Sequence, residues 1–303
     1  MNPESIRESS KAPPMLSIEG LKWPKIASGK VREIFDLGDE LLIVASDRLS
    51  AFDVILPDGI SAKGVVLTQL SLWWFRQIGD IISNHLAEGH ESRLDDLLED
   101  HPELRYRSML VRKLNPLPIE AVVRGYLAGS GWEIYEKTGK LFEFELPSGM
   151  KQSEKLAKPL FTPSTKAQSG HDEPIHLKEA SKLIGESLFA DVHRINMEIY
   201  KRGVTVSDRA GLLLADTKFE FGTDANGKLY LIDEVLTPDS SRYWPKDAYT
   251  VGRSQHAFDK QYVRDYLNTL DWDKTAPGPH LPEEVIRNTF ERYLEAYERL
   301  VSL

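Results

Sequence analysis

The chain has 303 residues, of which 41% are hydrophobic and 28% are charged, and its formal net charge is −9. This composition is typical of a soluble globular protein with a substantial core, and the length favours about two domains or one bilobed unit. The absence of cysteine excludes disulfides, thiolate metal sites and cysteine nucleophiles, and the acidic balance argues against a general nucleic-acid surface.

The beginning of the chain resembles neither a membrane span nor a secretory signal. No apolar run is long enough to cross a membrane, and the first residues lack the apolar centre of a signal peptide. We expect residues 1–15 to form a disordered tail. We also expect a cytoplasmic protein, with neither a membrane nor a nucleic acid as partner.

The first structured region has the pattern of a β-hairpin. Residues 26–35 and the apolar run LLIVAS at residues 41–46 flank a turn at residues 37–40. Near its start, Gly29, Lys30 and Arg32 could bring backbone amides and cations to a phosphate. The alternative is an ordinary turn, because the Walker A spacing is missing.

Residues 46–64 place several polar side chains between hydrophobic runs, and two explanations remain open. Asp47, Arg48, Ser50 and Asp53 form either a hydrogen-bonded structural network or the wall of a site. The following helix, at residues 67–78, has an aromatic stripe typical of a core.

The next stretch runs from an acidic segment to a possible domain boundary. Three histidines at residues 85, 90 and 101 lie in a polar, acidic stretch without metal-ligand spacing, and we interpret them as solvated. Residues 106–114 return to strand character. The NPLP sequence at residues 115–118 is the candidate boundary between lobes.

The middle of the chain combines an arginine with a glycine-rich turn. Glu120 and Arg124 lie on a β-branched run that breaks at Gly125 and again at residues 129–131, beside Ser130. A guanidinium, a hydroxyl and free amides suit a phosphate monoester. The alternative is a sharp strand-to-helix turn with a surface arginine.

A polar segment with little secondary-structure signal follows at residues 160–175. It contains Lys166, His171 and Asp172. A polar segment of this length is often a lid or a binding loop, although simple mobility is the alternative. We favour a structural role for His171, because a His-Asp neighbour pair alone is weak evidence for catalysis.

Residues 212–242 have the clearest pattern in the chain. Phe219 and Phe221 alternate with Asp216, Lys218 and Glu220, the period of a strand with one buried face. The Asn-Gly pair at residues 226–227 predicts a hairpin turn, and a second β-rich run follows at residues 229–235.

The length of the hairpin loop decides which residues face each other. A two-residue loop places Glu220 opposite Asp233, and a four-residue loop places Lys218 opposite Asp233. Either register gathers two carboxylates and an ammonium on one face, which predicts a Mg²⁺ ion between the acids. A solvated salt bridge is the alternative. A loop of three or five residues would put the acids on opposite faces and remove the argument.

The remainder of the chain supplies one more polar turn and two amphipathic helices. The turn at residues 239–242 contains Ser240 and Arg242, a second cation for an anionic substrate. A helix that begins near Ser254 and another over residues 282–303 have apolar stripes suited to packing.

The assembled motifs closely resemble those of the phosphoribosylaminoimidazole-succinocarboxamide synthase, or SAICAR synthetase, family, in its longer, yeast-type form. They are, in the family's order, GKVREIF, SDRLSAFD with the later AKG, LPIEAVVRGYLAGS, STKAQSGHDE, LADTKFEFG and DEVLTPDSSR. The resemblance implies an α+β fold with two lobes. A kinase-like, β-rich lobe at residues 16–115 would cover ATP, and a larger ATP-grasp-like lobe at residues 116–303 would hold the substrates and metal.

The resemblance also implies an activity. ATP, L-aspartate and the carboxylated aminoimidazole ribonucleotide CAIR would give SAICAR, ADP and phosphate through an acyl phosphate, in purine biosynthesis. ATP is then a cosubstrate and Mg²⁺ a cofactor, and the longer form resembles monomeric members. A phosphotransferase and a non-catalytic nucleotide-binding module are the competing hypotheses.

The family pattern assigns roles to particular residues. The expected ATP-binding residues are Gly29, Lys30, Arg32, Glu120, Lys218, Glu220 and Asp233. The last two would also hold Mg²⁺. The expected substrate-binding residues are Arg124, Ser130 and Arg242 at the CAIR phosphate, with Ser240, Asp53 and Lys63. The expected catalytic residues are Lys218, Lys166 and Asp172.

Overall fold

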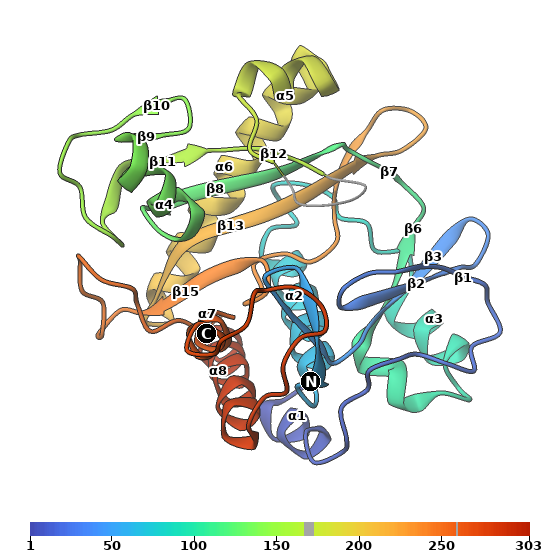
Figure 1. Cartoon of the computed structure of the whole chain (residues 1–303). Helices are drawn as coiled ribbons and strands as arrows, with labels where there is room; N and C mark the ends of the chain where they lie inside the picture. The colour runs from blue at the N-terminus through green and yellow to red at the C-terminus, as the bar shows by residue number, and fades with distance from the viewer. Residues whose placement is uncertain (167–172, 259) are drawn as a thin grey trace. The chain divides into compact units, whose positions relative to one another are not determined.

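A computed structural model of the chain describes residues 1–166, 173–258 and 260–303. The chain forms two compact units, and Figure 1 colours the chain by residue number. Unit 1 comprises residues 1–76, 84–114 and 258–302, and unit 2 comprises residues 77–83, 115–257 and 303. The sequence predicts a boundary at residues 115–116, and the units divide at 114–115. Residues 258–302, which the sequence assigns to the second lobe, belong to unit 1 instead.

Unit 1 combines an antiparallel sheet, in the order β1-β2-β3-β6, with a β4–β5 hairpin and helices. Its elements are α1 (Pro3–Ser9), β1 (Lys25–Ser28), β2 (Arg32–Asp36), β3 (Glu40–Ala45), β4 (Arg48–Ala51), β5 (Val54–Gly59), α2 (Lys63–Gln77), α3 (His90–Leu97), the 3₁₀ helix η1 (Pro102–Arg107), β6 (Ser108–Arg112), α7 (Gln261–Leu267) and α8 (Glu283–Val301).

The predicted first hairpin is confirmed as the β2–β3 pair. Phe35 of β2 lies opposite Leu42 of β3, which in turn lies opposite Leu110 of β6. These three side chains and Leu94 of α3 are buried in one apolar cluster. The apolar run of β3 is therefore a central strand, because it pairs on both edges.

Residues 1–15 are not the disordered tail that the sequence predicts, because they contain helix α1. The side chain of Asn2 caps the helix by accepting a hydrogen bond of 2.8 Å from the backbone N–H of Ser5. Ile6 is fully buried, and Arg7 forms an ion pair of 2.6 Å with Glu291 of α8. Such a short helix is marginal alone, so it depends on the packing surface that α8 provides.

Two of the three histidines in the acidic segment are buried, which corrects the prediction that they are solvated. The exposed fraction is 2% for His85 and 7% for His90. His85 packs against Phe75, with 5.5 Å between the ring centroids, and burial lowers the pKa of its imidazole to about 3. His90 accepts a hydrogen bond of 3.2 Å from the backbone N–H of Leu110 through Nδ1.

Unit 2 is built on an antiparallel sheet in the order β11-β8-β13-β14, to which β7, β12 and β15 are attached. Its elements are β7 (Asn115–Pro116), β8 (Ile119–Tyr126), α4 (Gly129–Thr138), β9 (Lys140–Leu141), β10 (Phe144–Glu145), β11 (Lys155–Phe161), β12 (Ser164–Thr165), α5 (Leu177–Ile184), α6 (Glu186–Arg209), β13 (Leu212–Thr223), β14 (Leu229–Ile232) and β15 (Ser241–Pro245).

Helix α6 crosses one face of this sheet, as Figure 1 shows, and two glycines allow the close approach. A Cβ atom at Gly125 of β8 would lie 2.0 Å from the hydroxyl of Tyr200, and one at Gly203 would lie 2.9 Å from Leu214. The Tyr200 hydroxyl donates a hydrogen bond of 2.8 Å to the backbone oxygen of Leu214. The opposite face of the strands is therefore left for polar side chains.

The combination of antiparallel sheets with separate helices confirms the predicted α+β class. None of the helices in the described ranges has the length and apolar character that crossing a membrane requires.

Candidate active site

Charged side chains of unit 2 lie on the sheet face that is turned away from α6. Gly125 faces α6, so its neighbour Arg124 faces the other side. Asp216 of β13 lies directly opposite Arg124 and therefore shares its face. Lys218 and Glu220 follow on the same face, because successive side chains of a strand alternate. One strand thus carries three charged groups along roughly 13 Å of the sheet, at 3.3 Å per residue.

The carboxylate of Asp216 lies between two guanidinium groups. Its Oδ2 accepts a hydrogen bond of 3.3 Å from Arg124 and a second one from Arg242 of β15. Arg124 also donates to the hydroxyl of Thr162 over 3.0 Å and to that of Ser130 over 3.2 Å. We call Arg124, Asp216 and Arg242 the arginine cluster. Two guanidinium groups thus contact one carboxylate.

The first turn of α4 lies against this cluster. Gly129 has a φ of +52°, and a Cβ atom there would come within 2.3 Å of Nη2 of Arg242. The sharp turn of the sequence analysis therefore exists, but Arg124 is only 8% exposed and is not a surface arginine. Burial lowers the pKa of the Arg124 guanidinium; Asp216 opposes this effect, and Arg242 adds to it. A bound anion would relieve the repulsion between the two arginines.

A second cluster surrounds the ammonium of Lys218. This group donates a hydrogen bond to Glu120 of β8 and lies 3.8 Å from Oε1 of Glu220, whose other oxygen accepts from Lys166. Burial disfavours the charge of Lys218, but Glu120, Glu220 and Asp233 outweigh it and raise the pKa of the ammonium above its usual value. Lys218 is therefore protonated at neutral pH.

We call Glu120, Lys166, Lys218, Glu220 and Asp233 the lysine–carboxylate cluster. It contains three carboxylates and two ammonium groups, whereas the arginine cluster contains two guanidinium groups and one carboxylate. The sheet face thus carries a guanidinium-rich cluster and, farther along β13, a carboxylate-rich one.

The loop of the β13–β14 hairpin differs from both predicted lengths. Glu220 lies opposite Ile232, so the connecting loop spans the five residues 224–228. In a regular hairpin this register would turn Asp233 away from Glu220. The strand ends at Ile232, however, and Asp233 has a φ of +63°, so the alternation does not extend to it. Asp233 still lies close enough to raise the pKa of Lys218.

The donor set of this cluster fits a hard divalent cation. Glu220 and Asp233 provide carboxylate oxygens, and Mg²⁺ commonly takes one or two protein carboxylates and completes its shell with water and substrate phosphate. The described residues include no group of three or more His, Cys, Asp or Glu side chains arranged to hold a metal. Glu220 forms ion pairs with Lys166 and Lys218, as the alternative of a salt bridge without a metal predicts. The same ion pairs hold the Glu220 carboxylate in place.

The three predicted ATP-binding residues of unit 1 lie at the turn between β1 and β2. The backbone N–H of Gly29 donates to the oxygen of Arg32 over 2.8 Å, and the ammonium of Lys30 pairs with Asp53. Arg48 fixes the turn by donating to the backbone oxygens of Gly29, over 2.9 Å, and Lys30, over 3.1 Å. This is a tight turn with a half-exposed lysine at its tip.

The polar segment at residues 46–64 is in large part a structural network. Asp47 is 1% exposed, accepts two hydrogen bonds of 2.9 and 3.1 Å from Arg107, and accepts a third from the backbone N–H of Gly64. Lys63, a predicted substrate-binding residue, is fully buried, with its ammonium 5.9 Å from the ring centroid of Tyr293. Asp53 is instead half exposed.

Ser240 lies in the turn before β15, where its backbone oxygen accepts a hydrogen bond of 2.9 Å from the N–H of Lys218. Asp172 lies outside the described residues. Neither Asp216 nor Thr162 has a site role predicted from the sequence. Asp216 could have been found, because it precedes Lys218 by two residues on the same strand face. The contact of Thr162 with Arg124 depends on strand pairing and has no local signal.

Solved structures of several proteins share this fold. The SAICAR synthase of Saccharomyces cerevisiae complexed with SAICAR superimposes with a TM-score of 0.84 at 39% identity, over 95% of this chain and 99% of that one. A SAICAR synthetase (Type-2) in complex with ADP has a TM-score of 0.67 at 24% identity, over 91% of this chain and 97% of that one, and shows the fold alone. The higher similarity to the yeast protein agrees with the predicted longer form.

Sequence comparison gives the same result. A phosphoribosylaminoimidazole-succinocarboxamide synthase of Geobacter metallireducens is 52% identical over 277 residues, which are 91% of this chain and 93% of that protein. One from Xanthomonas campestris pv. campestris is 50% identical over 290 residues, covering 91% and 93%. The family model described as SAICAR synthetase matches residues 25–279, and the chain therefore belongs to the SAICAR synthetase family.

Proposed function

We propose that this chain is a phosphoribosylaminoimidazole-succinocarboxamide synthase, a carbon–nitrogen ligase of purine biosynthesis. It uses ATP to join CAIR to L-aspartate and releases SAICAR, ADP and phosphate. The observation that carries this conclusion is the family match over residues 25–279, supported by a relative of this name that is 52% identical over 91% of the chain.

We place the phosphate of CAIR at the arginine cluster. Arg124 and Arg242 present two guanidinium groups, and the Ser130 hydroxyl lies 3.2 Å from Arg124. Guanidinium groups bind phosphate oxygens in pairs, which gives orientation as well as affinity. Ser240, Asp53 and Lys63 remain further predicted substrate contacts, although Lys63 would have to leave its buried position.

We place the triphosphate of ATP at the lysine–carboxylate cluster, with Glu120 toward the adenosine end. Lys218 would neutralise negative charge on the transferred phosphoryl group, and its raised pKa keeps it charged for this task. Glu220 and Asp233 would hold Mg²⁺, which would shield the phosphate oxygens when bound. Gly29, Lys30 and Arg32 are the predicted phosphate contacts from unit 1.

The chemistry follows from the poor leaving group of a carboxylate. Displacement of an oxide ion from CAIR is prohibitive, so phosphorylation first turns its carboxylate into an acyl phosphate. The aspartate amine then attacks the carbonyl carbon, the new C–N bond forms and phosphate leaves. Lys166, paired with Glu220, would stabilise charge beside the reacting groups. The amine proton would pass either to Asp172 or to the departing phosphate.

Omission assays test the reaction class. The ligase should release phosphate from ATP at its full rate only when CAIR and aspartate are both present. A phosphotransferase would need no aspartate, and a nucleotide-binding module would turn over no ATP. Full phosphate release without aspartate would therefore overturn the ligase assignment.

Substitution of the two predicted metal ligands tests the site. Glu220→Ala and Asp233→Ala should each lower turnover by about a hundredfold or more, as expected when an electrostatic contact to the transferring phosphoryl group is lost. Both should also weaken binding of Mn²⁺, used as a probe in the presence of ADP. Asp191→Ala, on the exposed side of α6, is the control. Near-normal rates and Mn²⁺ binding in both variants would reject the metal assignment.

The cytoplasmic location and the monomeric state stay predictions. Light scattering coupled to size-exclusion chromatography measures the second directly, and a mass near 34.4 kDa is expected. A mass of twice this value would show that the longer form does not imply a monomer.

A further inference from the structure

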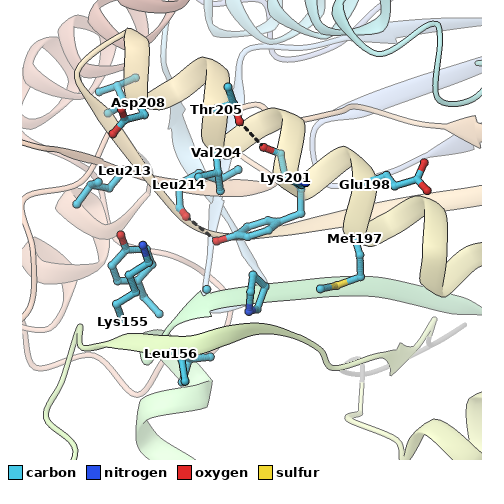
Figure 2. A pocket seen from close by; sticks show the side chains of 16 residues that line it. Lys155, Leu156, Met197, Glu198, Lys201, Val204, Thr205, Asp208, Leu213 and Leu214 are labelled. Carbon is cyan, nitrogen blue, oxygen red and sulfur yellow. Dashed lines mark hydrogen bonds between the residues drawn. The ribbon is translucent and has the colours of Figure 1, made fainter.

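Unit 2 contains a cavity of about 560 Å³ beside α6, shown in Figure 2. Its wall combines apolar side chains, such as Met197 and Val204, with Lys201 and with the acids Glu198 and Asp208. Because charges of both signs line this cavity, they favour neither an anion nor a cation. The turn between β1 and β2 in unit 1 differs, because one neighbouring segment binds all of its backbone oxygens.

The β1–β2 turn, residues 29–31, accepts hydrogen bonds from residues 46 and 48, where β3 passes into β4. The guanidinium of Arg48 donates through Nη2 to the oxygen of Gly29, over 2.9 Å, and through Nε to that of Lys30, over 3.1 Å. The oxygen of Val31 accepts from the N–H and from the hydroxyl of Ser46, each over 2.9 Å. The backbone oxygens of the turn are therefore all occupied on one side.

Arg48 is itself held in place by further contacts. Its Nη1 donates to Glu33 over 2.8 Å and to the backbone oxygen of Leu16 over 2.7 Å. The exposed fraction is 11% for the Arg48 side chain and 2% for that of Glu33. A planar guanidinium binds several acceptors in a fixed geometry, and its charge strengthens each bond. These N–H groups are directed at oxygens of the protein, so Arg48 is poorly placed to be a phosphate ligand.

Peptide geometry converts these contacts into an orientation of the amides. In a planar trans peptide, the oxygen of one residue and the N–H of the next point in opposite directions. Because the oxygens of Gly29 and Lys30 point toward Arg48, the N–H groups of Lys30 and Val31 point away from it. Within the described ranges, neither of these N–H groups donates a hydrogen bond. Lys30 is exposed and Val31 is partly exposed, so a ligand can reach the turn.

This arrangement suits an anion. Successive backbone N–H groups form anion-binding concavities, whereas the negative ends of backbone carbonyl dipoles repel phosphate. The ammonium of Lys30, which pairs with Asp53, adds a positive charge at the tip of the turn. Rotation of either peptide unit would replace an N–H by an oxygen. Arg48 opposes this rotation, because its largely buried N–H groups would lose their acceptors.

We propose that Arg48 is a positioning residue for the nucleotide phosphates. It holds the peptide units that follow Gly29 and Lys30, so that the N–H groups of Lys30 and Val31 donate to phosphate oxygens of ATP. Arg48 itself does not contact the nucleotide. This inference rests on the proposed use of ATP, and it adds a residue that acts only through the β1–β2 turn.

Arg48→Lys tests the proposal, because a compact ammonium cannot replace a fork that spans several oxygens. Calorimetric titration with ADP and Mg²⁺ should give a Kd about tenfold above that of the parent, the loss of about one charge-assisted hydrogen bond. The KM for ATP should rise by a similar factor, while the KM for CAIR stays the same. Arg93→Lys is the matched control and should change none of these values. Arg93 also binds a carboxylate, that of Glu40, and the backbone oxygen of Glu88, but it lies outside the turn.

Hydrogen exchange distinguishes positioning from the alternatives. Without nucleotide, the segment 26–35 should exchange faster in Arg48→Lys than in the parent, whereas β3, residues 40–45, should exchange at the parent rate. A direct phosphate contact by Arg48 would weaken ADP binding without changing exchange in the free protein. General damage to unit 1 would speed exchange in both segments. Either of these results, or an unchanged Kd for ADP, would overturn the proposal.

A measurement on the parent protein decides if Arg48→Lys does not fold. With ¹⁵N-labelled lysine and valine, the amide signals of Lys30 and Val31 should shift downfield when ADP and Mg²⁺ saturate the protein. Unchanged signals would overturn the positioning role. Failure of the proposed function would look different, because a parent that binds ADP but does not join CAIR to aspartate contradicts the ligase assignment, while the amide signals still decide about the turn.

Discussion

Removing the carboxylate of Asp216 should destabilise unit 2 strongly. Asp216 is 5% exposed and is the anion between Arg124, itself 8% exposed, and Arg242. In Asp216→Asn the two guanidinium groups keep their positions but lose the charge that balances them. Their repulsion then acts in a poorly solvated environment, where it is not screened by water.

The structure sets the size of the effect. Breaking a buried ion pair costs about 3–5 kcal/mol. We expect the lower end of this range, about 3 kcal/mol, because asparagine keeps one acceptor oxygen and because Arg242 is partly solvated. For a unit of this size, 1 kcal/mol corresponds to roughly 2–4 °C, so the melting temperature should fall by roughly 6–12 °C.

Urea unfolding followed by circular dichroism measures this loss of stability. The same measurement in the presence of inorganic phosphate tests whether an anion binds between the arginines. An anion that binds between the arginines should stabilise the Asn variant more than the parent. At one hundred times its dissociation constant it should restore about 2.7 kcal/mol. Asp208→Asn is the control, because its pair with Lys246 is half exposed and should contribute less than about 1 kcal/mol.

Two results would refute the reasoning. A loss below about 1 kcal/mol in Asp216→Asn would show that the carboxylate does not balance the two arginines. Equal stabilisation of parent and variant by phosphate would show that the anion binds elsewhere.

Three further predictions concern the active site and unit 1. Arg242→Ala should raise the KM for CAIR while the KM for ATP stays the same, and an unchanged CAIR dependence would show that this arginine binds something else. Gly129→Ala should also raise the KM for CAIR, because its Cβ would lie 2.3 Å from Arg242. Gly139→Ala is the control, because Gly139 also has a positive φ but has open space around it. An equal rise of the KM in the control would attribute the effect to backbone strain. The free energy of unfolding should fall between pH 6.5 and pH 3, because the unfolded state protonates His85 near its ordinary pKa while burial lowers the folded-state pKa to about 3. The loss should reach about 2 kcal/mol by pH 5 and be absent in His85→Phe; the same loss in that variant would assign it to other groups.

Features that depend on residue type and local order could be predicted from the sequence. Alternation along Asp216, Lys218 and Glu220 predicted a strand with a charged face, and β13 has that face. The glycine-rich turn after Arg124 predicted a sharp strand-to-helix turn, and Gly129 does bring a helix start against Arg242, whereas anion binding there stays a prediction. These features are local, because strand period and glycine conformation depend on a few consecutive residues.

Pairing and burial were harder to predict. The hairpin loop has a length that would have removed the metal argument, yet Asp233, which has a positive φ just beyond the end of β14, still acts on the pKa of Lys218. Helix α1 forms because α8 provides a surface more than 280 residues away in sequence, as the pair of Arg7 with Glu291 shows. Burial of Lys63 and His85 likewise depends on segments distant in sequence.

The sequence by itself determined the fold class, the family and the kinds of charged group that the candidate site contains, because strand period, turn chemistry and motif order can be recognised from consecutive residues. Only the tertiary structure decided that Asp216 joins two arginines, that three carboxylates surround Lys218, and that a cavity opens beside α6. Those arrangements depend on which strand lies next to which and in what register, and that choice is made by the packing of the whole unit.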